Sequence, residues 1–453
     1  MAAQPTPSRT SDQDRNPGGR HPADSRLDAA RRLFAHLGEH LGADLTIRLW
    51  NGERVSLGPS PPGDLMLALN SPDALTRIIR RPRLPTLIEL IAEGGITIEG
   101  GTLLDIAARR GTMNRKGLLR RLNKGLLLRC LLPFLFRGRK SASTSFAYAG
   151  TDAAKDAQGR DNKALIQFHY DLSNNFYGLF LDPQMVYSCA YFPRWDAGLE
   201  EAQSAKLEMI CRKLRLAPGD RFLDIGCGWG GLVCHAALHH GVTAHGVTLS
   251  QAQLDFAREK IARLGLEARV TVELKDYKAL SGEYDKIASI GMFEHVGLDN
   301  HDAYFRHLRG LLRPRGLLLN HAITRPAKKD LRTFRRKRPE FAALTRYIFP
   351  GGELDYIGLS LTNLERHGFE VHDVEGWREH YARTCRLWTE RLHANRAAAE
   401  REVGPARTRL WLLYLAGCAL AFERGGANIF QTLASKRARG PSGLPPTRAD
   451  LYR

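Results

Sequence analysis

The sequence predicts an α/β protein: a doubly wound, mostly parallel sheet with a small α+β domain on its N-terminal side. Three observations lead to this prediction. Between residues 221 and 323, short apolar runs alternate with helical stretches, which is the order of βα units. A glycine-rich turn follows the first of these runs. The pair Asn51-Gly52, between two alternating runs, indicates a separate β-hairpin.

The N-terminal part carries the signals of a small α+β domain. Residues 1–25 are rich in Pro, Ser, Gly and charged residues without periodicity, and we expect a disordered tail there. A helix is expected from Leu27, and the hairpin follows it. A second helix is predicted at Ala74–Arg80 and a strand in ITIEGG, residues 96–101.

Residues 116–140 alternate leucine and phenylalanine with arginine and lysine. A basic amphipathic helix of this kind can lie on an anionic bilayer. It can equally bridge two domains, with basic side chains that reach past apolar surface to water. We therefore predict a lipid-associated α+β domain at residues 26–140, followed by a flexible linker at 141–163.

The second domain is predicted to begin at residue 164, in a segment crowded with aromatic side chains. They are Phe168, Tyr170, Phe176, Tyr177, Phe180, Tyr187, Tyr191, Phe192 and Trp195. Core packing explains some of them, but the Asn, Asp and Ser residues between the rings favour the wall of a binding pocket.

The glycine turn lies in RFLDIGCGWGG, residues 221–231, after the apolar run Phe222–Ile225. The glycines are Gly226, Gly228, Gly230 and Gly231. They let the backbone approach a ligand closely, and the helix that follows offers free N–H groups. This is the order of a nucleotide-binding βα unit, although the same turn also closes units that bind nothing.

Two features of the neighbouring sequence favour S-adenosylmethionine over a nicotinamide dinucleotide. Asp224 stands just before the first glycine, where a carboxylate can meet a ligand amine. The segment HGVTLSQAQ, residues 245–253, has no acidic residue to hold a ribose diol. Thr248, Ser250 and Gln253 offer hydroxyl and amide contacts instead.

The remaining strands are predicted at 244–249, 270–274, 286–290 and 317–323, with helices between them. Ligands on such sheets bind beyond the carboxyl ends of the strands. This rule places Asp224, 248–253, 275–277, 291–295 and 320–323 on one rim. Residues 436–453 are expected to form a C-terminal tail.

Composition limits the cellular setting. The 453 residues suffice for two domains, and the formal net charge of +19 indicates an anionic partner, either nucleic acid or an acidic membrane. The seven cysteines include no C-x-x-C pair, which is typical of free thiols in a reducing compartment. No secretory signal is visible, and the apolar run Leu410–Phe422 is too short for a bilayer of about 30 Å. We expect a cytoplasmic protein.

Eight blocks of sequence together resemble one family. They are HYDLSNNFYGLFLD, MVYSCAYF, LDIGCGWGG, GVTLSQAQ, SIGMFEHVG, HAI, YIFPGG and HYARTCRLW. This order is similar to that of the cyclopropane-fatty-acyl-phospholipid synthases, which resemble the mycolic acid cyclopropane synthases. The resemblance covers roughly residues 165–435. It implies a Rossmann-like class I methyltransferase fold for a catalytic domain at 164–435.

The resemblance implies an enzyme that transfers methylene from S-adenosylmethionine to the cis double bond of a phospholipid acyl chain. The cofactor would be contacted by Tyr187, Ser188, Leu223, Asp224, Gly226, Gly228, Gly230, Gly231, Thr248, Leu249, Ser250, Gln253, Asp276 and Tyr277. A bicarbonate, acting as base, would be held by Cys189, Glu294, His321, Ile323 and Tyr381. The face formed by Tyr381, Cys385, Trp388 and Leu392 at helical spacing would point Tyr381 inward.

Each of these residues also has a structural reading. Glu294 can cap a helix, His321 can be a satisfied core histidine, and Cys189 can be a small buried hydrophobe. Their joint occurrence around one rim favours a site. We expect no metal site, because no spaced set of His, Cys and Asp appears in the sequence.

Two departures from the family pattern stand out. Asn175 occupies a position where the family has Asp. The segment 325–338 carries eight basic residues and one Asp, and we predict that it touches phospholipid headgroups, unless it is only a solvated lid. The expected partners are unsaturated acyl chains and the anionic inner face of the membrane, bound peripherally, and a homodimer is compatible with them.

Three other functions compete with this reading. A fatty-acyl methyltransferase would stop at methyl- or methylene-branched chains. A nucleic-acid methyltransferase would explain the charge, but no Asn-Pro-Pro-aromatic motif is present, so we expect no nucleic-acid partner. A catalytically silent lipid-binding protein would not need Asp224, Glu294, His321 and Tyr381 together.

Overall fold

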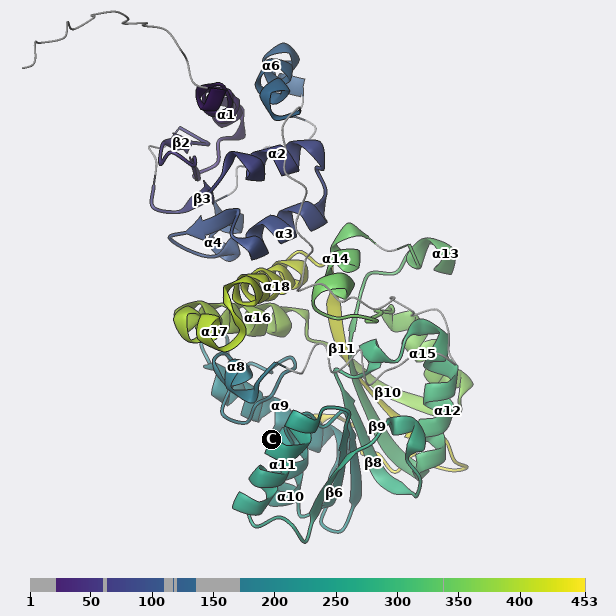
Figure 1. Ribbon diagram of the computed structural model, residues 1–453. Helices are drawn as coiled ribbons and strands as arrows, with labels where there is room; N and C mark the ends of the chain where they lie inside the picture. The colour runs from purple at the N-terminus through teal and green to yellow at the C-terminus, as the bar shows by residue number, and fades with distance from the viewer. Residues whose placement is uncertain are drawn as a thin grey trace, which may run out of the picture. The chain divides into compact units, whose positions relative to one another are not determined.

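The computed structural model describes residues 22–59, 63–109, 117, 120–135, 172–336 and 338–452, with side chains from Ser25 onward. The predicted linker, the first residues of the tail, and Phe168 and Tyr170 lie outside the described residues. By contact density the chain forms two compact units. Unit 1 contains residues 1–82, 95–100 and 109–140, and unit 2 contains the rest (Figure 1).

Unit 1 has a four-stranded sheet in the order β2-β1-β3-β4. The strands are β1 Thr46–Arg48, β2 Arg54–Ser56, β3 Met66–Leu69 and β4 Ile96–Glu99. β1 and β2 form the predicted antiparallel hairpin, and Gly52 in its turn has a φ of 91°, which a side chain would resist. Helix α1 spans Pro22–Leu41, so the last four residues of the predicted tail are helical.

The basic segment 116–140 is not one continuous helix. Helix α6, Lys124–Leu135, begins after Asn123, whose side-chain Oδ1 accepts a hydrogen bond from the backbone N–H of Leu126 at 3.1 Å. α6 packs on α1 and on α2, Pro72–Arg80, with Cys130 and Phe134 buried. Asn123 therefore caps the N-terminus of α6, and α6 is a docked element of unit 1.

The N-terminal domain predicted at 26–140 needs correcting at two helices. Helices α3, Leu84–Glu93, and α4, Leu103–Ala108, fall in unit 2. Their buried residues Ile88, Ala92 and Leu104 share a hydrophobic cluster with α18, Pro405–Glu423. The sequence could not predict that α3 and α4 belong to unit 2, because an apolar helix face does not show which element packs against it.

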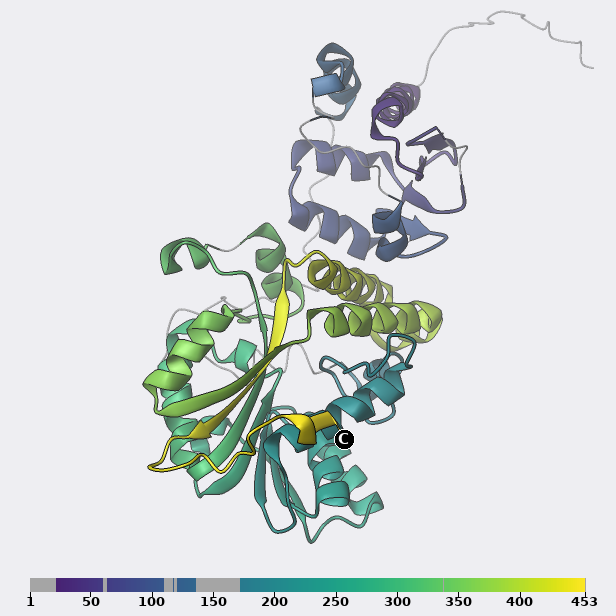
Figure 2. The same cartoon turned by 180° about the vertical axis from the view of Figure 1, so that it is seen from behind.

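Unit 2 is built on a seven-stranded sheet in the order β10-β11-β9-β8-β5-β6-β7. The strands are β5 Arg221–Ile225, β6 Thr243–Thr248, β7 Val270–Leu274, β8 Tyr284–Ile290, β9 Leu312–Thr324, β10 Phe369–Gly376 and β11 Asn428–Lys436. The five predicted strands are all present and mutually parallel. β10 and β11 were not predicted, and β11 runs antiparallel between β9 and β10 (Figure 2).

Helices cover both faces of this sheet, as predicted. One face buries α9 Leu199–Leu214, α10 Gly231–His240 and α11 Gln251–Arg263. The other face buries α12 His301–Leu311 and α15 Ile357–Arg366. The remaining helices are α8 Asn174–Gly178, α13 Leu331–Phe334, α14 Pro339–Tyr347, α16 Arg378–Ala394 and α17 Arg396–Val403, with short 3-10 turns at 277–279, 293–295, 298–300 and 449–452.

A bulge and the C-terminal end differ from the simple sheet pattern. Residues 314–316 form a bulge inside β9, where Arg315 has a φ of 64°. The predicted C-terminal tail is docked: Leu451 is buried and its turn packs against α9. Among the helices that the structure describes, none is both long and apolar enough to cross a membrane.

Candidate active site

The glycine turn between β5 and α10 is held tightly against the neighbouring strand. The backbone N–H groups of Gly226 and Cys227 both donate to the carbonyl of Val247, at 2.9 and 3.0 Å. Gly226 has a φ of 81°, and a Cβ there would come within 3.0 Å of the Met292 side chain. Glycine is therefore required at this position both by conformation and by space.

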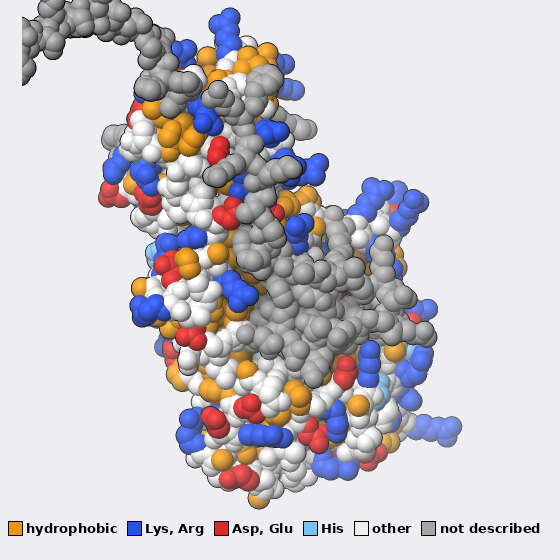
Figure 3. All heavy atoms as spheres, viewed as in Figure 1, with side chains coloured by type: hydrophobic (Ala, Val, Ile, Leu, Met, Phe, Trp, Pro, Cys, Tyr) orange, Lys and Arg blue, Asp and Glu red, His pale blue; other side chains and the backbone are white. Residues whose placement is uncertain are grey.

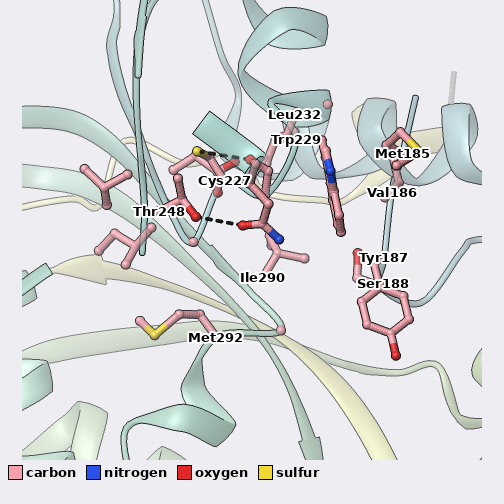
Figure 4. Close-up of a pocket in the computed structure, with 18 of the residues that line it drawn as sticks. Met185, Val186, Tyr187, Ser188, Cys227, Trp229, Leu232, Thr248, Ile290 and Met292 are labelled. Carbon is pink, nitrogen blue, oxygen red and sulfur yellow. Dashed lines mark hydrogen bonds between the residues drawn. The ribbon is translucent and has the colours of Figure 1, made fainter. Parts of the chain in front are cut away.

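A pocket opens at the carboxyl ends of β5, β6 and β8 beside this turn, and we call it the glycine-loop pocket (Figure 4). Ten of the predicted cofactor residues line it. They are Tyr187, Ser188, Asp224, Gly226, Gly228, Gly231, Thr248, Leu249, Gln253 and Tyr277. The hydroxyl of Thr248 donates to Gln253 Oε1 at 2.7 Å, which fixes both polar groups at the wall.

Four predicted cofactor residues do not line the pocket. Leu223 is fully buried in β5, where its side chain belongs to the core. Gly230 adopts a φ of 77° at the start of α10, where a Cβ would lie 3.1 Å from the Cβ of Ala257 on α11. Ser250 caps α11 by accepting from the N–H of Gln253. Asp276 accepts from the N–H of Lys278 at 2.9 Å and lies between Lys275 and Tyr277, which do line the pocket.

Lys206 lines the pocket although it was not predicted, and Trp229 of the glycine turn and Met292 of the predicted rim line it too. Trp229 stands inside the glycine turn itself, and its indole N–H donates to Asn174 Oδ1 at 2.7 Å. Figure 4 shows Trp229 and Tyr187 at the same end of the pocket. The position of Trp229 among four glycines of the turn is the sequence feature that indicates a pocket residue. Asn175, the departure noted above, is exposed and does not line the pocket.

The polar wall of the pocket contains a buried acid and a buried base. Asp224 is 2% exposed, and its Oδ1 has no hydrogen-bond partner among the described residues. Burial raises the pKa of Asp224 to about 7, against the effect of Lys206. Burial lowers the pKa of Lys206 to about 8, and its Nζ donates to Ser188 Oγ at 2.9 Å. The pocket thus offers one carboxylate oxygen to a ligand.

The aromatic block divides between core and pocket. Phe176, Tyr177 and Phe180 are fully buried and pack on Trp411, so they belong to the hydrophobic core. Tyr187 lines the pocket while its ring lies 5.1 Å from that of Trp388. Trp195 is exposed. The pocket wall predicted from this block is therefore supplied mainly by Tyr187.

The five predicted catalytic residues, Cys189, Glu294, His321, Ile323 and Tyr381, form a cluster beside the pocket, and we call it the Glu294 cluster. Glu294 Oε1 accepts from the backbone N–H of Ile323 at 2.6 Å. Cys189 Sγ lies 3.8 Å from the carbonyl of Trp377, and the N–H of Tyr381 donates to that same carbonyl at 3.0 Å. The Trp377 and His321 rings meet edge to face at 5.4 Å. Trp377 therefore joins three parts of the cluster.

The cluster adjoins the pocket but does not line it. Cys189 follows the lining residue Ser188, and Glu294 stands between the lining residues Met292 and His295. The backbone N–H of the lining Gly291 donates to the carbonyl of His321 at 2.8 Å. The five residues, which come from distant parts of the sequence, thus lie next to residues that line the pocket.

Two buried polar atoms of the cluster have no hydrogen-bond partner among the described residues: Glu294 Oε2 and His321 Nε2. Burial raises the pKa of Glu294 to about 7 and lowers that of His321 well below its usual value. His321 is therefore neutral. Gln431 Nε2 donates to His321 Nδ1 at 2.9 Å, which leaves the ring proton on Nε2.

The side chain that contacts His321 Nδ1 is Gln431 on β11. The prediction missed Gln431 because β11 was not recognised as a strand. It also missed Asp355, a buried carboxyl whose Oδ2 accepts from Ser360. Burial, with a further contribution from Glu294, raises the pKa of Asp355 to about 7. Asp355 pairs with Thr324, next to Ile323, so two buried acids flank the end of β9.

Comparison with known proteins gives one consistent result. The family model for mycolic acid cyclopropane synthetase matches residues 157–432. A probable fatty acid methyltransferase of Pseudomonas putida is 38% identical over 92% of this chain and 98% of its own length. The cyclopropane-fatty-acyl-phospholipid synthase of Escherichia coli K12 is 40% identical over 59% of this chain and 66% of its own.

Solved structures agree with these matches. The mycolic acid cyclopropane synthase CmaA1, complexed with SAH and CTAB, is 36% identical and covers 60% of this chain and 98% of its own, with a TM-score of 0.57. Coclaurine N-methyltransferase, 21% identical with a TM-score of 0.52, shares the fold. The fold is thus that of the class I methyltransferases. The chain belongs to the mycolic acid cyclopropane synthetase family.

Proposed function

We propose that this protein transfers a methylene group from S-adenosylmethionine to the cis double bond of unsaturated acyl chains in membrane phospholipids, forming a cyclopropane ring. The observation that supports it best is the Glu294 cluster directly behind the glycine-loop pocket. A methyl donor in the pocket and a base in the cluster would be only a few side chains apart.

The glycine-loop pocket fits S-adenosylmethionine. The unpartnered Asp224 Oδ1 can accept from the donor's amine, and the Tyr187 and Trp229 rings can face its positive sulfonium. Thr248 and Gln253 offer further hydroxyl and amide contacts. The acidic residue that NAD sites use at this position is absent from residues 245–253.

The Glu294 cluster fits a bicarbonate ion. His321 Nε2–H can donate to an oxygen of the anion, and Glu294 Oε2 can accept its O–H. Neither atom has another partner among the described residues, and a buried polar group without a partner costs about 1–3 kcal/mol. Bicarbonate, when bound, would supply the base for the last proton transfer.

The chemistry explains why the surroundings are apolar. The alkene carbon takes the methyl group from sulfur, and the adjacent carbon is left as a carbocation. The methyl group then loses a proton, and its C–H electrons form the bond that closes the ring. Water would capture the cation, so the chain must exclude it. The Tyr187, Trp388 and Tyr381 rings can stabilise the charge without reacting, by roughly 0.5–2 kcal/mol each.

We further propose that the protein binds the anionic inner face of the membrane peripherally. Leu128 and Leu132 on α6 are 60% and 43% exposed beside basic side chains. In segment 325–338, Lys328, Lys329, Arg332, Arg336 and Arg338 are exposed, and Figure 3 shows Lys and Arg side chains gathered near α13. Each basic residue near an anionic surface contributes about 1 kcal/mol.

Two arginines of that segment serve the fold instead. The Arg325 guanidinium lies 3.7 Å from the centre of the Phe334 ring, and Arg335 pairs with Asp299 at 2.5 Å. We therefore expect the double variant Arg332→Ser, Arg336→Ser to bind phosphatidylglycerol vesicles more weakly than the wild type. A second double variant, Leu128→Ser, Leu132→Ser, should also bind them more weakly. Glu390→Gln, exposed on α16, is the control. Unchanged vesicle binding in both double variants would remove the membrane role.

A second candidate is a fatty-acyl methyltransferase that produces branched chains. The match to the probable fatty acid methyltransferase of Pseudomonas putida, over nearly its whole length, favours it. Lipid analysis of cells that express the wild type or Glu294→Gln tests both candidates. We expect the wild type to add 14 mass units to unsaturated phospholipids and the variant almost none. Fragmentation then separates a cyclopropane from a methylene branch of equal mass, and the branch would overturn ring closure.

A further inference from the structure

Outside the pocket and the Glu294 cluster, four side chains of types that can bind a metal lie close together between α9 and α10. They are Glu208 and Cys211 on α9, and His235 and His240 on α10. The donor atoms of Cys211 and the two histidines all lie within 4.8 Å of one another. From this geometry we propose that the four residues form a zinc site.

The distances suit one ion. Glu208 Oε2 lies 3.2 Å from His235 Nε2 and 3.1 Å from His240 Nε2. Donor atoms bound to a tetrahedral zinc at about 2.0–2.3 Å are separated by about 3.3–3.7 Å. The carboxylate oxygen of Glu208 is therefore close to this spacing from both histidines, and Cys211 Sγ lies within 4.8 Å of a donor atom of each histidine.

The helices place these residues for a local reason. Glu208 and Cys211 are three residues apart on α9, so they share one face. His235 lies on α10, and His240 is its last residue, just before Gly241 with a φ of 67°. α9 and α10 pack against each other on one face of the sheet, which brings the two pairs together.

A neighbouring arginine orients the carboxylate of Glu208. Arg212 Nε donates to Glu208 Oε1 at 2.7 Å, which orients the carboxylate and leaves Oε2 for an ion. Cys211 would lose its proton to solvent as the ion binds.

A thiolate, two imidazoles and one carboxylate select zinc over magnesium or calcium, which prefer oxygen ligands alone. The alternative is a metal-free network in which Glu208 accepts from both imidazoles. That network does not involve the thiol of Cys211, whereas a zinc site does. His235 and His240 side chains are 14% and 17% exposed, so an ion can reach them from solvent.

The ion would stabilise the wall of the glycine-loop pocket. α9 carries the lining residues Lys206, Leu207 and Ile210, and α10 begins at the lining Gly231. A bond between these two helices would restrain both sides of the pocket. This site does not depend on the proposed reaction, because its ligands lie outside the Glu294 cluster.

The test uses the full chain, freed of metal by a chelator and then titrated with Zn²⁺ or Co²⁺. We expect one ion per chain and, with Co²⁺, a thiolate-to-cobalt charge-transfer band. Cys211→Ser should abolish that band, and His240→Ala should weaken Zn²⁺ binding by at least about 100-fold. Cys234→Ser and His239→Ala, a buried thiol and an exposed imidazole on the same helix, should leave both unchanged.

His240→Ala decides the question if Cys211→Ser does not fold, because His240 lies at a partly exposed helix end. Circular dichroism checks the folding of each variant. Absence of binding by the wild type at micromolar Zn²⁺, or equal Zn²⁺ affinity in the wild type and a folded His240→Ala, would overturn the site.

Discussion

The carboxyl group of Glu294 is held at one oxygen only, because Oε1 accepts from the backbone N–H of Ile323 at 2.6 Å while Oε2 has no partner among the described residues. The first bond fixes the side chain on the end of β9. The second oxygen is left buried beside His321 Nε2, which is also unpartnered. Five predictions follow from this arrangement and from the pocket next to it.

Replacing Glu294 by Gln should lower kcat about 10²–10⁴-fold with little change in S-adenosylmethionine affinity. The amide oxygen of Gln can still accept from Ile323, so the fold is kept. The amide NH2 group then takes the place of Oε2, and it can only donate, so it cannot accept from an anion's O–H. Turnover on phospholipid vesicles and calorimetric titration of the cofactor measure the two effects. Wild-type kcat in the variant would contradict the assigned role.

The same substitution should change the dependence of stability on pH. The pKa of Glu294 rises from 4.5 to about 7 on folding, so between these values the folded chain holds a proton that the unfolded chain has lost. The wild-type free energy of unfolding therefore falls as pH rises from about 4.5 to about 7. Glu294→Gln has no carboxyl group to titrate, so its free energy of unfolding should not fall in this way. Relative to the wild type, the free energy of unfolding of the variant should rise by on the order of 2–3 kcal/mol across that pH range, as measured by urea denaturation.

Asp355 should influence the titration of Glu294. The two buried carboxyl groups interact, so each makes ionisation of the other harder. In Asp355→Asn the apparent pKa of Glu294 should fall, and the acidic limb of the kcat profile should move to lower pH. Asp302→Asn, which changes an exposed acid of unit 2, is the control. A loss of activity without any shift of the profile would indicate a purely structural Asp355.

Gln431→Glu tests the tautomer of His321. A carboxylate in place of the amide accepts from Nδ1, so the ring proton leaves Nε2 or a second proton is added. We expect kcat to fall at least about 10-fold, while cofactor affinity stays unchanged. Nitrogen chemical shifts of labelled histidine report the tautomer directly. A neutral ring that still carries its proton on Nε2 and none on Nδ1 in the variant would show that Gln431 does not set the tautomer.

Asp224→Asn should weaken S-adenosylmethionine binding about 10–100-fold, because a charge-assisted hydrogen bond in a buried site is worth about 1.5–3 kcal/mol. Isothermal titration calorimetry measures this loss. Asp255→Asn, an exposed residue of α11 that Gln251 contacts, should bind the cofactor normally. Equal affinity in Asp224→Asn and wild type would exclude Asp224 as a cofactor ligand.

Much of the fold could be predicted from the chain because its signals are local. The alternation of β5 to β9 with helices, the turn at Asn51-Gly52 and the glycines after Ile225 each depend on a few adjacent residues. Strands β10 and β11 were not predicted. β11 runs antiparallel between β9 and the edge strand β10, and both strands follow the βα alternation of β5 to β9 in the sequence.

By itself the sequence determined the α/β class, the glycine turn, ten lining residues of the pocket and the resemblance that named Glu294 and His321. The tertiary structure alone decided that Gln431 holds His321, that Asp355 stands next to Glu294, that α3 and α4 pack in unit 2, and that Cys211 meets His235 and His240. The physical reason is common to all four. Each is a contact between segments far apart along the chain, and short-range periodicity carries no information about which segments pack together.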